Sequence, residues 1–517
     1  MDKKKRVWAA LGWGMTAAQS IASILFIYFL YQTSLVPNRY IVYLGLLLSL
    51  AIIAVICIEK WRPIKGHIAG LILCAAFIGV LTAGYHYISL IEQSLDSISI
   101  PVAEEVDVMV VAVRGDDPAQ DITDAKEYLF GVSNMAGSEK GTKSVAYLNE
   151  IIGNDIKTVT LDSPMEEVEA LLSNQCDAIV YNEAYTGTLE EGIGDYSNKV
   201  RVLYRFNLKT DLPERENISK KENTEQEKSG VEKPFTVYIS GIDVEGPIST
   251  TSRSDVNILM TINPDTHWIL LTTTPRDYYV YIPDVSGDNR DKLTHAGIYG
   301  IQASISTLEE LYGVHIDYYV RVNFTSLITI VDALDGVDVY SEYTFDVGDF
   351  SYVEGMNHLS GIEALAFSRE RYAFKEGDNQ RGKNQQAVLS AIIDKITSYQ
   401  ALSHADELLA VVSDCTQTSI PKDEIKKLVK RQMDEGIKWK IFSQAATGTG
   451  DHQPTYSTGK RELYVMWPSE QMVEALSDNM DGVLKGNDPI SLDTIDISDI
   501  DSLEKTDEPE EVEEPEE

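Results

Sequence analysis

Cysteine is scarce in this chain of 517 residues, which contains four. Cys57 and Cys74 lie inside long apolar runs, and Cys176 and Cys415 lie far apart in the more polar part of the sequence. This spacing matches neither a disulfide framework nor a cysteine-based metal site. The sequence therefore argues against a fold that depends on disulfides, and we expect the four thiols to be small buried side chains.

Basic residues are also few, with 44 lysines and arginines against 81 aspartates and glutamates and a formal net charge of −37. A surface with this balance repels polyanions, so the composition excludes nucleic acid as a partner over a broad face. Part of the acidic excess lies in residues 481–517, which lack a periodic apolar pattern and are predicted to be a disordered tail. A local arginine pocket for one phosphate group stays compatible with this composition.

Three apolar runs occupy the N-terminal part of the chain: residues 7–31, 40–58 and 67–88. Each has about the 20 residues that a membrane-spanning helix needs, and all are nearly free of charge. Core helices of a soluble protein are the alternative, but such helices are rarely so long and so apolar. Residues 1–90 are therefore predicted to be a membrane anchor with three transmembrane helices.

Basic residues predict how these helices are oriented. Four of them, residues 3–6, precede the first run, and Lys60, Arg62 and Lys65 lie between the second and third runs. Since basic loops stay in the cytoplasm, the N-terminus is predicted to be cytoplasmic and the chain after residue 90 extracellular. The cytoplasmic segments are too short for a DNA-binding unit or nucleotide-driven machinery. A reaction catalysed on the extracellular side would need a substrate that is already activated, and a lipid-linked substrate fits this requirement.

The rest of the chain is predicted to be of the α/β class. Residues 103–206 alternate strand-like and helix-like runs, which predicts a small α/β accessory domain. Residues 207–233 are dense in mixed charge and poor in apolar residues, as is typical of a linker. Residues 234–480 are predicted to form a larger three-layer α/β/α domain with a mixed central sheet, in which residues 446–459 are a polar stretch.

Two aspartates give the first indication of chemistry. Asp243 ends one strand-like run and Asp255 opens the next, so a short connection could bring both carboxylates to one edge of a sheet. Such a pair suits Mg²⁺, which keeps several waters and is commonly completed by phosphate oxygens of a substrate. The alternative is that each aspartate only caps a turn, as aspartates at strand ends often do.

Arginines surround these aspartates in the sequence although the chain is acidic. Arg276 lies at a strand end, where its planar guanidinium could bind phosphate oxygens or pair with a neighbouring carboxylate. Arg381 and Gln385 lie one turn apart near the N-terminus of a predicted helix. Arg369 and Arg371 cannot share one helical face, so the chain is expected to leave the helix there if both enter one cleft. Together these residues indicate a site for a multiply charged anion and a divalent metal, and hence phosphoryl chemistry.

The charged residues belong to short motifs that occur in the order of a known family. The motifs are ISGID (239–243), SRSD (252–255), TPRD (274–277), KLTHA (292–296), DYYV (317–320), LDGV (334–337) and SRER (368–371), followed by Arg381 and Gln385. With them the chain resembles the LytR-CpsA-Psr family of Gram-positive envelope proteins. It is similar to the capsule-associated, CpsA-like branch, which also has three spans and an accessory domain.

The resemblance implies a membrane-anchored phosphotransferase. Such a cell-wall ligase moves a glycopolymer, for example a capsular polysaccharide or a teichoic acid, from undecaprenyl-pyrophosphate to peptidoglycan with the help of Mg²⁺. It implies that Asp243 and Asp255 hold the metal and that Arg253 orients the pyrophosphate or these carboxylates. The residues implied in binding the pyrophosphate of the lipid-linked glycan are Arg276, Arg369, Arg371, Arg381 and Gln385, with Lys292 as a further contact.

The resemblance also implies an apolar tunnel for the polyprenyl chain. The aliphatic residues of the two helices predicted to begin near Ile301 and Thr325 are the candidates for its wall, although their spacing alone would predict ordinary core residues. Two other functions stay open at this point. A polyprenyl-pyrophosphate phosphatase would use the same charges with water as acceptor. A non-catalytic scaffold or regulator of capsule synthesis would bind other capsule-synthesis proteins.

Overall fold

The computed structural model of the chain describes residues 3–61, 64–98, 104–133, 139–211, 230–242, 248–375, 377–398, 408, 411–412, 415–490 and 492. Arg62, Asp243, most of the predicted linker (212–229) and most of the predicted tail (493–517) lie outside the described residues.

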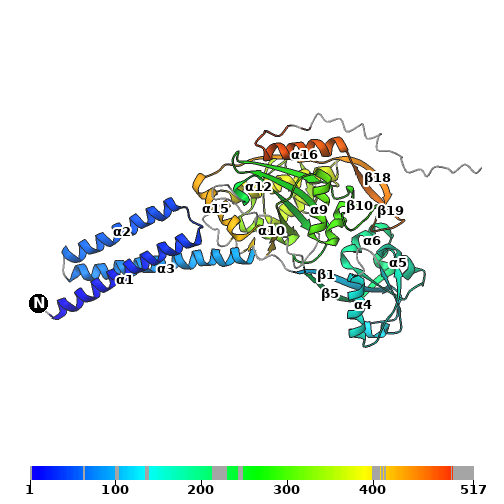
Figure 1. Ribbon diagram of the computed structural model, residues 1–517, viewed down its shortest axis with the longest axis horizontal. Coiled ribbons are helices and arrows are strands. Elements are labelled where there is room, and N and C mark those ends of the chain that lie inside the picture. Colours follow the sequence, from blue (N-terminus) through cyan, green and yellow to red (C-terminus); the bar gives the residue numbers. More distant parts are fainter. Residues whose placement is uncertain are drawn as a thin grey trace, which may run out of the picture.

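Three long helices form the N-terminal part and lie side by side as a bundle that projects from the rest of the molecule (Figure 1). They are α1 (Lys3–Thr33), α2 (Asn38–Trp61) and α3 (Lys65–Ile98). All three are long and apolar enough to cross a membrane, which confirms the prediction of three apolar helices. Large aliphatic side chains such as Ile24 and Leu47 are exposed on the bundle, as expected for surfaces that face lipid.

A five-stranded mixed sheet follows, in the order β3-β2-β4-β1-β5. Its strands are β1 (Glu104–Arg114), β2 (Leu129–Ser133), β3 (Lys157–Leu161), β4 (Ala178–Asn182) and β5 (Val200–Asp211). The helices in this part are α4 (Glu139–Ile152), α5 (Pro164–Leu172), α6 (Thr186–Gly192) and α7 (Tyr196–Lys199). Residues 104–211 are called the first sheet unit below. The last strand, β5, includes the first five residues of the predicted linker.

A six-stranded mixed sheet forms the centre of the second sheet unit, residues 230–490, with the order β16-β11-β6-β7-β8-β17. The strands are β6 (Phe235–Ile242), β7 (Ser254–Asn263), β8 (Trp268–Thr274), β11 (Tyr318–Asn323), β16 (Gln417–Thr418) and β17 (Lys440–Ala445). β6 pairs antiparallel with β7 and parallel with β11, so the sheet is mixed as predicted.

Helices pack on both faces of this sheet because apolar residues alternate along its strands. Tyr238 belongs to a core with α9 (Ile301–Tyr312) and α16 (Glu470–Leu484). Its neighbours Val237 and Ile239 belong to the opposite core, against α12 (Asp378–Ile396) and α15 (Lys422–Glu435). The end of α16 includes residues 481–484, where the predicted tail begins.

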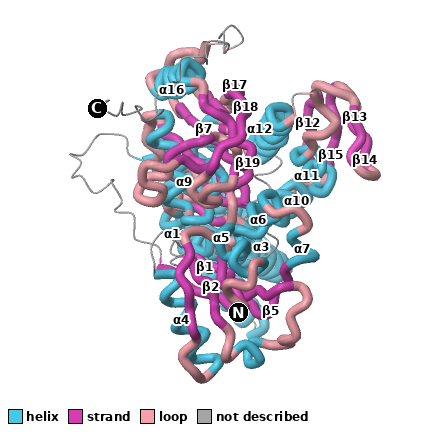
Figure 2. Tube along the Cα trace, turned by 90° about the vertical axis from the view of Figure 1, so that its right-hand side faces the viewer, coloured by secondary structure: helices cyan, strands magenta, loops and turns pink. Residues whose placement is uncertain are grey.

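Smaller elements surround this sheet (Figure 2). The helices are α8 (Leu293–Ala296), α10 (Phe324–Ala333) and α11 (Gly361–Arg369). The strands form two-stranded sheets: β9 (Tyr279–Tyr281) with β10 (Arg290–Lys292), β12 (Val337–Ser341) with β15 (Gly355–Leu359), β13 (Phe345–Val347) with β14 (Phe350–Tyr352), and β18 (Gly448–Pro454) with β19 (Glu462–Pro468). The stretch 446–459, which has no predicted structure, thus contributes a strand to the last pair.

The two sheet units are in direct contact. Glu105 of β1 and Arg321 of β11 form an ion pair at 3.0 Å, and both side chains are buried. Val106 forms an isolated backbone bridge with Thr250. Helix α6 lies at the boundary between the units (Figure 1) and contacts β19. The first sheet unit therefore packs against the same part of the molecule that carries the predicted site residues.

Candidate functional site

The central site residues lie at one edge of the six-stranded sheet. β6 ends at Ile242 and β7 begins at Ser254, so their antiparallel pairing places Asp255 at this edge. β8 ends at Thr274, beside the start of β7, and Arg276 follows two residues later. Strand register, rather than closeness in sequence, thus brings the aspartate and the arginine together.

Asp255 is an ionised carboxylate held by two donors. Nη1 of Arg276 donates to its Oδ2 at 2.7 Å, and Oγ1 of Thr294 donates to its Oδ1 at 2.8 Å. Burial alone would raise the pKa of the Asp255 carboxyl, but the guanidiniums of Arg276 and Arg253 hold that pKa below its usual value. The group is therefore charged at neutral pH.

Arg276 lies between two carboxylates. Its Nη1 donates to Asp255, and its buried Nε lies 3.7 Å from Oδ2 of Asp277 without a hydrogen bond to any residue that the structure describes. A guanidinium has five N–H donors, so pairing with Asp255 leaves others for an anionic oxygen in the cavity that Arg276 lines. The geometry thus suits Arg276 for binding a phosphate oxygen while it pairs with Asp255.

Helix α12 adds two of the predicted residues from its first turns. Arg381 and Gln385 line the same cavity as Asp255 and Arg276. Arg381 forms an ion pair with Asp378, the first residue of the helix. Burial raises the pKa of the Asp378 carboxyl, although Arg381 opposes this effect. The family motifs do not include Asp378; the i,i+3 spacing from Arg381 at a helix start is the signal that could have found it.

Arg369 and Arg371 reach the cavity from the end of α11. The helix ends at Arg369 and the next residue, Glu370, is extended with φ −67° and ψ 133°, so the predicted exit from the helix is confirmed. The guanidinium of Arg369 lies 4.1 Å from the ring centre of Phe324, and that of Arg371 lies 4.7 Å from the ring centre of Tyr372. Nη2 of Arg371 also donates to the Tyr372 hydroxyl, and contact with an aromatic face leaves the other N–H groups of both guanidiniums able to bind an anion.

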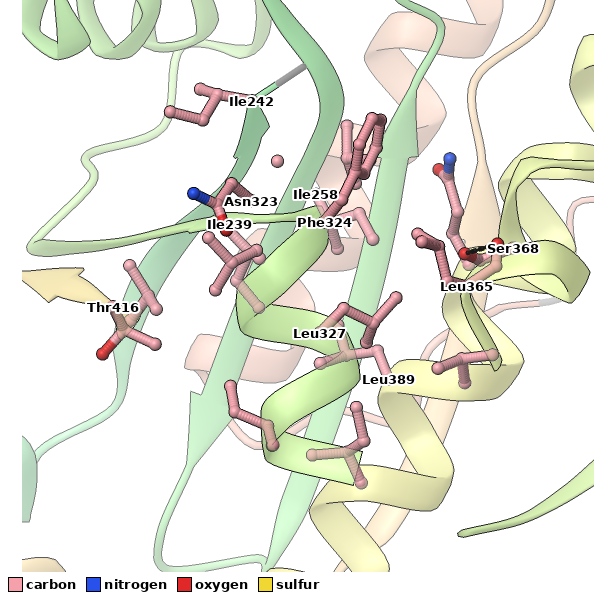
Figure 3. Close-up of a pocket in the computed structure, with 18 of the residues that line it drawn as sticks. Ile239, Ile242, Ile258, Asn323, Phe324, Leu327, Leu365, Ser368, Leu389 and Thr416 are labelled. Carbon is pink, nitrogen blue, oxygen red and sulfur yellow. Dashed lines mark hydrogen bonds between the residues drawn. The ribbon is translucent and has the colours of Figure 1, made fainter. Parts of the chain in front are cut away.

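The cavity has a charged end and an apolar body, with a volume of about 670 Å³. The body runs between the sheet and the helices α10 and α12 and is lined by aliphatic side chains such as Ile239, Leu327 and Leu389 (Figure 3). The prediction of an apolar wall from the helix after Thr325 agrees with this lining. The prediction that the helix beginning at Ile301 also lines the tunnel is wrong, because this helix, α9, packs in the core on the opposite face of the sheet.

Two predicted residues lie near the site without lining the cavity. Lys292 is 1% exposed, and its Nζ lies 2.9 Å from Glu191 and 3.3 Å from Asp277. The guanidinium of Arg253 lies against Gly187 of α6, because a Cβ atom added there would be 2.5 Å from its Nη1. Both side chains are therefore placed beside the charged end rather than inside it, and the prediction that Lys292 contacts phosphate stays a prediction.

The described residues fit a magnesium ion only in part. Asp255 supplies an ionised carboxylate, and each of its oxygens keeps a lone pair beyond its one hydrogen bond. Asp243 follows the last residue of β6 in the sequence but lies outside the described residues. Within the described ranges no group of three or more His, Cys, Asp or Glu side chains could hold a metal. Mg²⁺ is commonly completed by waters and substrate oxygens, and the magnesium site stays a prediction.

Comparison with known proteins agrees with the motif order. The model of the LytR_cpsA_psr family matches residues 202–472, more than half of the chain. The chain belongs to the LytR-CpsA-Psr family. This confirms the resemblance at the level of the family, while membership of the CpsA-like branch stays a prediction.

Curated members of the family include close relatives of this chain. One is the polyisoprenyl-teichoic acid–peptidoglycan teichoic acid transferase TagU of Bacillus cereus, 33% identical over 208 residues, which are 40% of this chain and 67% of the relative. Another is the TagU protein of Enterococcus faecalis, 34% identical over 198 residues, which are 38% of this chain and 64% of the relative. The chain thus spans about two thirds of the length of these relatives.

Solved structures of similar proteins include TagV of Bacillus subtilis, with 26% identity and a TM-score of 0.43 over 49% of this chain and 98% of the other. Another is TagT bound to LI-WTA, with 28% identity and a TM-score of 0.40 over 51% of this chain and 95% of the other.

Proposed function

We propose that this protein is a membrane-anchored phosphotransferase that moves a glycopolymer from polyprenyl-pyrophosphate to peptidoglycan. The observation that carries the proposal is the cavity in which ionised Asp255 and four arginines meet a long apolar body. A pyrophosphate joined to an isoprenoid chain has the same two parts, a multiply charged head and an apolar tail. The relatives named as polyisoprenyl-teichoic acid–peptidoglycan transferases support this choice of donor and acceptor.

In this proposal the basic residues bind the pyrophosphate and offset charge that builds on it during transfer. Arg276 offers N–H groups beyond the one that pairs with Asp255, and further guanidiniums come from Arg381 in α12, from Arg369 at the end of α11 and from Arg371 just after it. Preorganised cations in a partly buried site stabilise such charge more strongly than water does. A hydroxyl of peptidoglycan would attack the phosphorus that carries the glycan, the bond between the two phosphates would break, and polyprenyl phosphate would leave.

The finer assignments belong to the same proposal. Asp255, with Asp243, would hold Mg²⁺, which would supply further positive charge to the pyrophosphate. The donor lipid would be undecaprenyl-pyrophosphate, the glycopolymer a capsular polysaccharide or a teichoic acid, and capsule-synthesis proteins would be partners. The basic residues at the start of α1 and around the connection from α2 to α3 support an orientation in which the N-terminus is cytoplasmic and both sheet units are outside.

The test uses the full chain, purified in detergent, with a polyprenyl-pyrophosphate-linked disaccharide as donor and uncrosslinked peptidoglycan as acceptor. We expect a covalent disaccharide–peptidoglycan product and release of polyprenyl phosphate, both dependent on added Mg²⁺. Free disaccharide phosphate without the adduct would instead indicate the phosphatase, with water as acceptor. Absence of both products would favour the non-catalytic scaffold.

A further inference from the structure

The first sheet unit contributes a carboxylate to a chain of charges that ends in the proposed site. Glu191 of α6 lies 2.9 Å from Nζ of Lys292, which lies 3.3 Å from Oδ1 of Asp277. Oδ2 of Asp277 lies 3.7 Å from Nε of Arg276, and Nη1 of Arg276 contacts Asp255 at 2.7 Å. Alternating charges thus connect α6 with the aspartate of the cavity.

Burial strengthens the inner part of this series of contacts. The side chain of Lys292 is 1% exposed and that of Asp277 is 11% exposed, so water screens their charges poorly, whereas Glu191 is 37% exposed and its attraction for Lys292 is screened more. A buried lysine needs carboxylate partners, and the second partner, Glu191, comes from the first sheet unit. Without Glu191 the whole charge of Lys292 would act on Asp277, which would then attract Arg276 less strongly.

Two further contacts of α6 reach the same group of residues. Oγ1 of Thr188 lies 3.0 Å from Nε2 of His295, within the short helix α8 whose Thr294 donates to Asp255. Gly187 provides the surface on which the Arg253 guanidinium lies. Three residues of one short helix therefore touch the residues that support the charged end of the cavity.

We propose that α6 positions Arg276 for the transfer reaction through Glu191, Lys292 and Asp277. The first sheet unit then contributes to catalysis by the site in the second sheet unit. The inference rests on the proposed function, since it assigns a role to Arg276 in that reaction. Glu191 is a positioning residue: it does not line the cavity, and it acts on the guanidinium through two intervening side chains. The same geometry assigns Lys292 to support of the site rather than to contact with phosphate.

Steady-state transfer by the full chain, with the same disaccharide donor and peptidoglycan acceptor, tests the inference. Glu191→Gln is expected to lower kcat about tenfold, because Arg276 is no longer held in position for the reaction. KM for the donor should not rise, because the loss of a negative charge makes the site more attractive to the anionic pyrophosphate. Glu191→Asp keeps the charge and should retain most of the rate. Glu190→Gln, an exposed neighbour on the same helix, is the matched control and should behave as the unchanged protein.

A double-variant comparison separates positioning from folding. Lys292→Met should lower kcat as Glu191→Gln does, and Glu191→Gln should add nothing further in that background, since residues in one chain of contacts are not additive. Two results would overturn this inference and leave the proposed function standing. One is additive losses in the double variant. The other is a kcat of Glu191→Gln within about twofold of the unchanged protein while Arg276→Ala is inactive. A loss of rate that matches a loss of thermal stability would also overturn it. Normal transfer by Arg276→Ala and Arg381→Ala would overturn the proposed function itself.

Discussion

Arg381 is the residue whose removal tests the charged end of the cavity most directly. It lies in the first turns of α12 and faces the cavity, so Arg381→Ala removes a guanidinium from the pyrophosphate site without creating a gap in the apolar core. We expect transfer to fall at least about a hundredfold, close to the roughly 3 kcal/mol that one charged contact in a transition state contributes. The thermal midpoint should fall as well, because Asp378 loses its ion-pair partner, so transfer is compared at a temperature at which both proteins are folded.

Lys383 provides the matched control for this change. It lies two residues further along α12, its side chain is exposed, and it is not among the described residues that line the cavity. Lys383→Ala removes the same charge from the same helix and should leave the transfer rate unchanged. Equal losses in the two variants would mean that total charge on α12, rather than a guanidinium in the cavity, matters for activity.

Asp378 predicts a pH dependence of stability. Burial raises its pKa above the usual value of 3.8, so the folded protein binds this proton more tightly than the unfolded chain does. The stability that this group contributes is therefore fully present below the usual pKa and is lost as pH rises through the raised, folded value. Asp378→Asn stays neutral throughout, and its thermal midpoint relative to the unchanged protein should be higher at pH 7 than at pH 4. An equal or opposite difference at the two pH values would contradict the assignment.

The residues of the site were predictable from sequence to the extent that they lie in motifs. Asp255, Arg276, Arg381 and Gln385 each occur at a strand end or a helix start, and the structure brings these four together around one cavity. The partner of Lys292 was not predictable, because Glu191 lies 101 positions away in a part of the sequence without a motif. Pairing between distant charges is decided by how two units pack, which local patterns do not encode.

At the scale of elements, we expect Gly→Ala substitutions at two helical glycines to have different effects on the stability of the protein. A Cβ atom on Gly361, at the start of α11, would be 2.3 Å from the backbone carbonyl oxygen of Ile328 in α10. Gly361→Ala should therefore force α10 and α11 apart and destabilise the protein by about 1–3 kcal/mol. These helices line the cavity through Leu327 and Leu365, so binding of farnesyl pyrophosphate, measured by calorimetry, should weaken as well.

Gly482 in α16 is the control for this effect. Its nearest atom outside the local helix would be 3.8 Å from an added Cβ, which is ordinary contact. Gly482→Ala should leave stability unchanged or raise it by up to about 1 kcal/mol, because alanine favours helix more than glycine does. Chemical denaturation of both variants checks the pair, and destabilisation by both would show that the space around Gly361 is not the cause.

Helices were easier to predict than the small sheets. The sequence predicts a helix start near Arg381, where α12 begins, and strand boundaries at Asp255 and Arg276, where β7 begins and β8 ends. Neither β18 nor β19 is predicted, and the residues of β18, GTGDHQP, carry almost no strand preference. That strand exists because β19 pairs with it along its whole length.

At the scale of the whole molecule, the membrane bundle is joined to the second sheet unit by ion pairs. Glu92 of α3 lies 2.7 Å from both Lys422 and Lys426 of α15. Beside these charges, Leu95 of α3 packs with Val412 and Ile425, two residues that also line the apolar body of the cavity. Helices α3 and α15 lie next to each other (Figure 1), so the residues at this end of the cavity lie beside the last helix of the bundle.

This junction predicts that loss of the α3–α15 contact matters most for donors embedded in a membrane. Glu92→Lys places three like charges together and should separate the helices, since partly buried like charges repel. In proteoliposomes, transfer from a long polyprenyl donor should fall about tenfold, while transfer from a soluble farnesyl-pyrophosphate-linked donor in detergent should hardly change. Lys426→Glu in the same chain should restore one ion pair and part of the rate, because Lys426 pairs with Glu92 whereas Lys422 also pairs with Asp96. Arg39→Ala is the control. It removes an exposed ion pair with Asp434 and an exposed hydrogen bond to the Met433 carbonyl, and it should have little effect because exposed contacts of this kind contribute little. If Glu92→Lys slows both donors equally, the contact supports the fold of the second sheet unit and not access of lipid to the cavity.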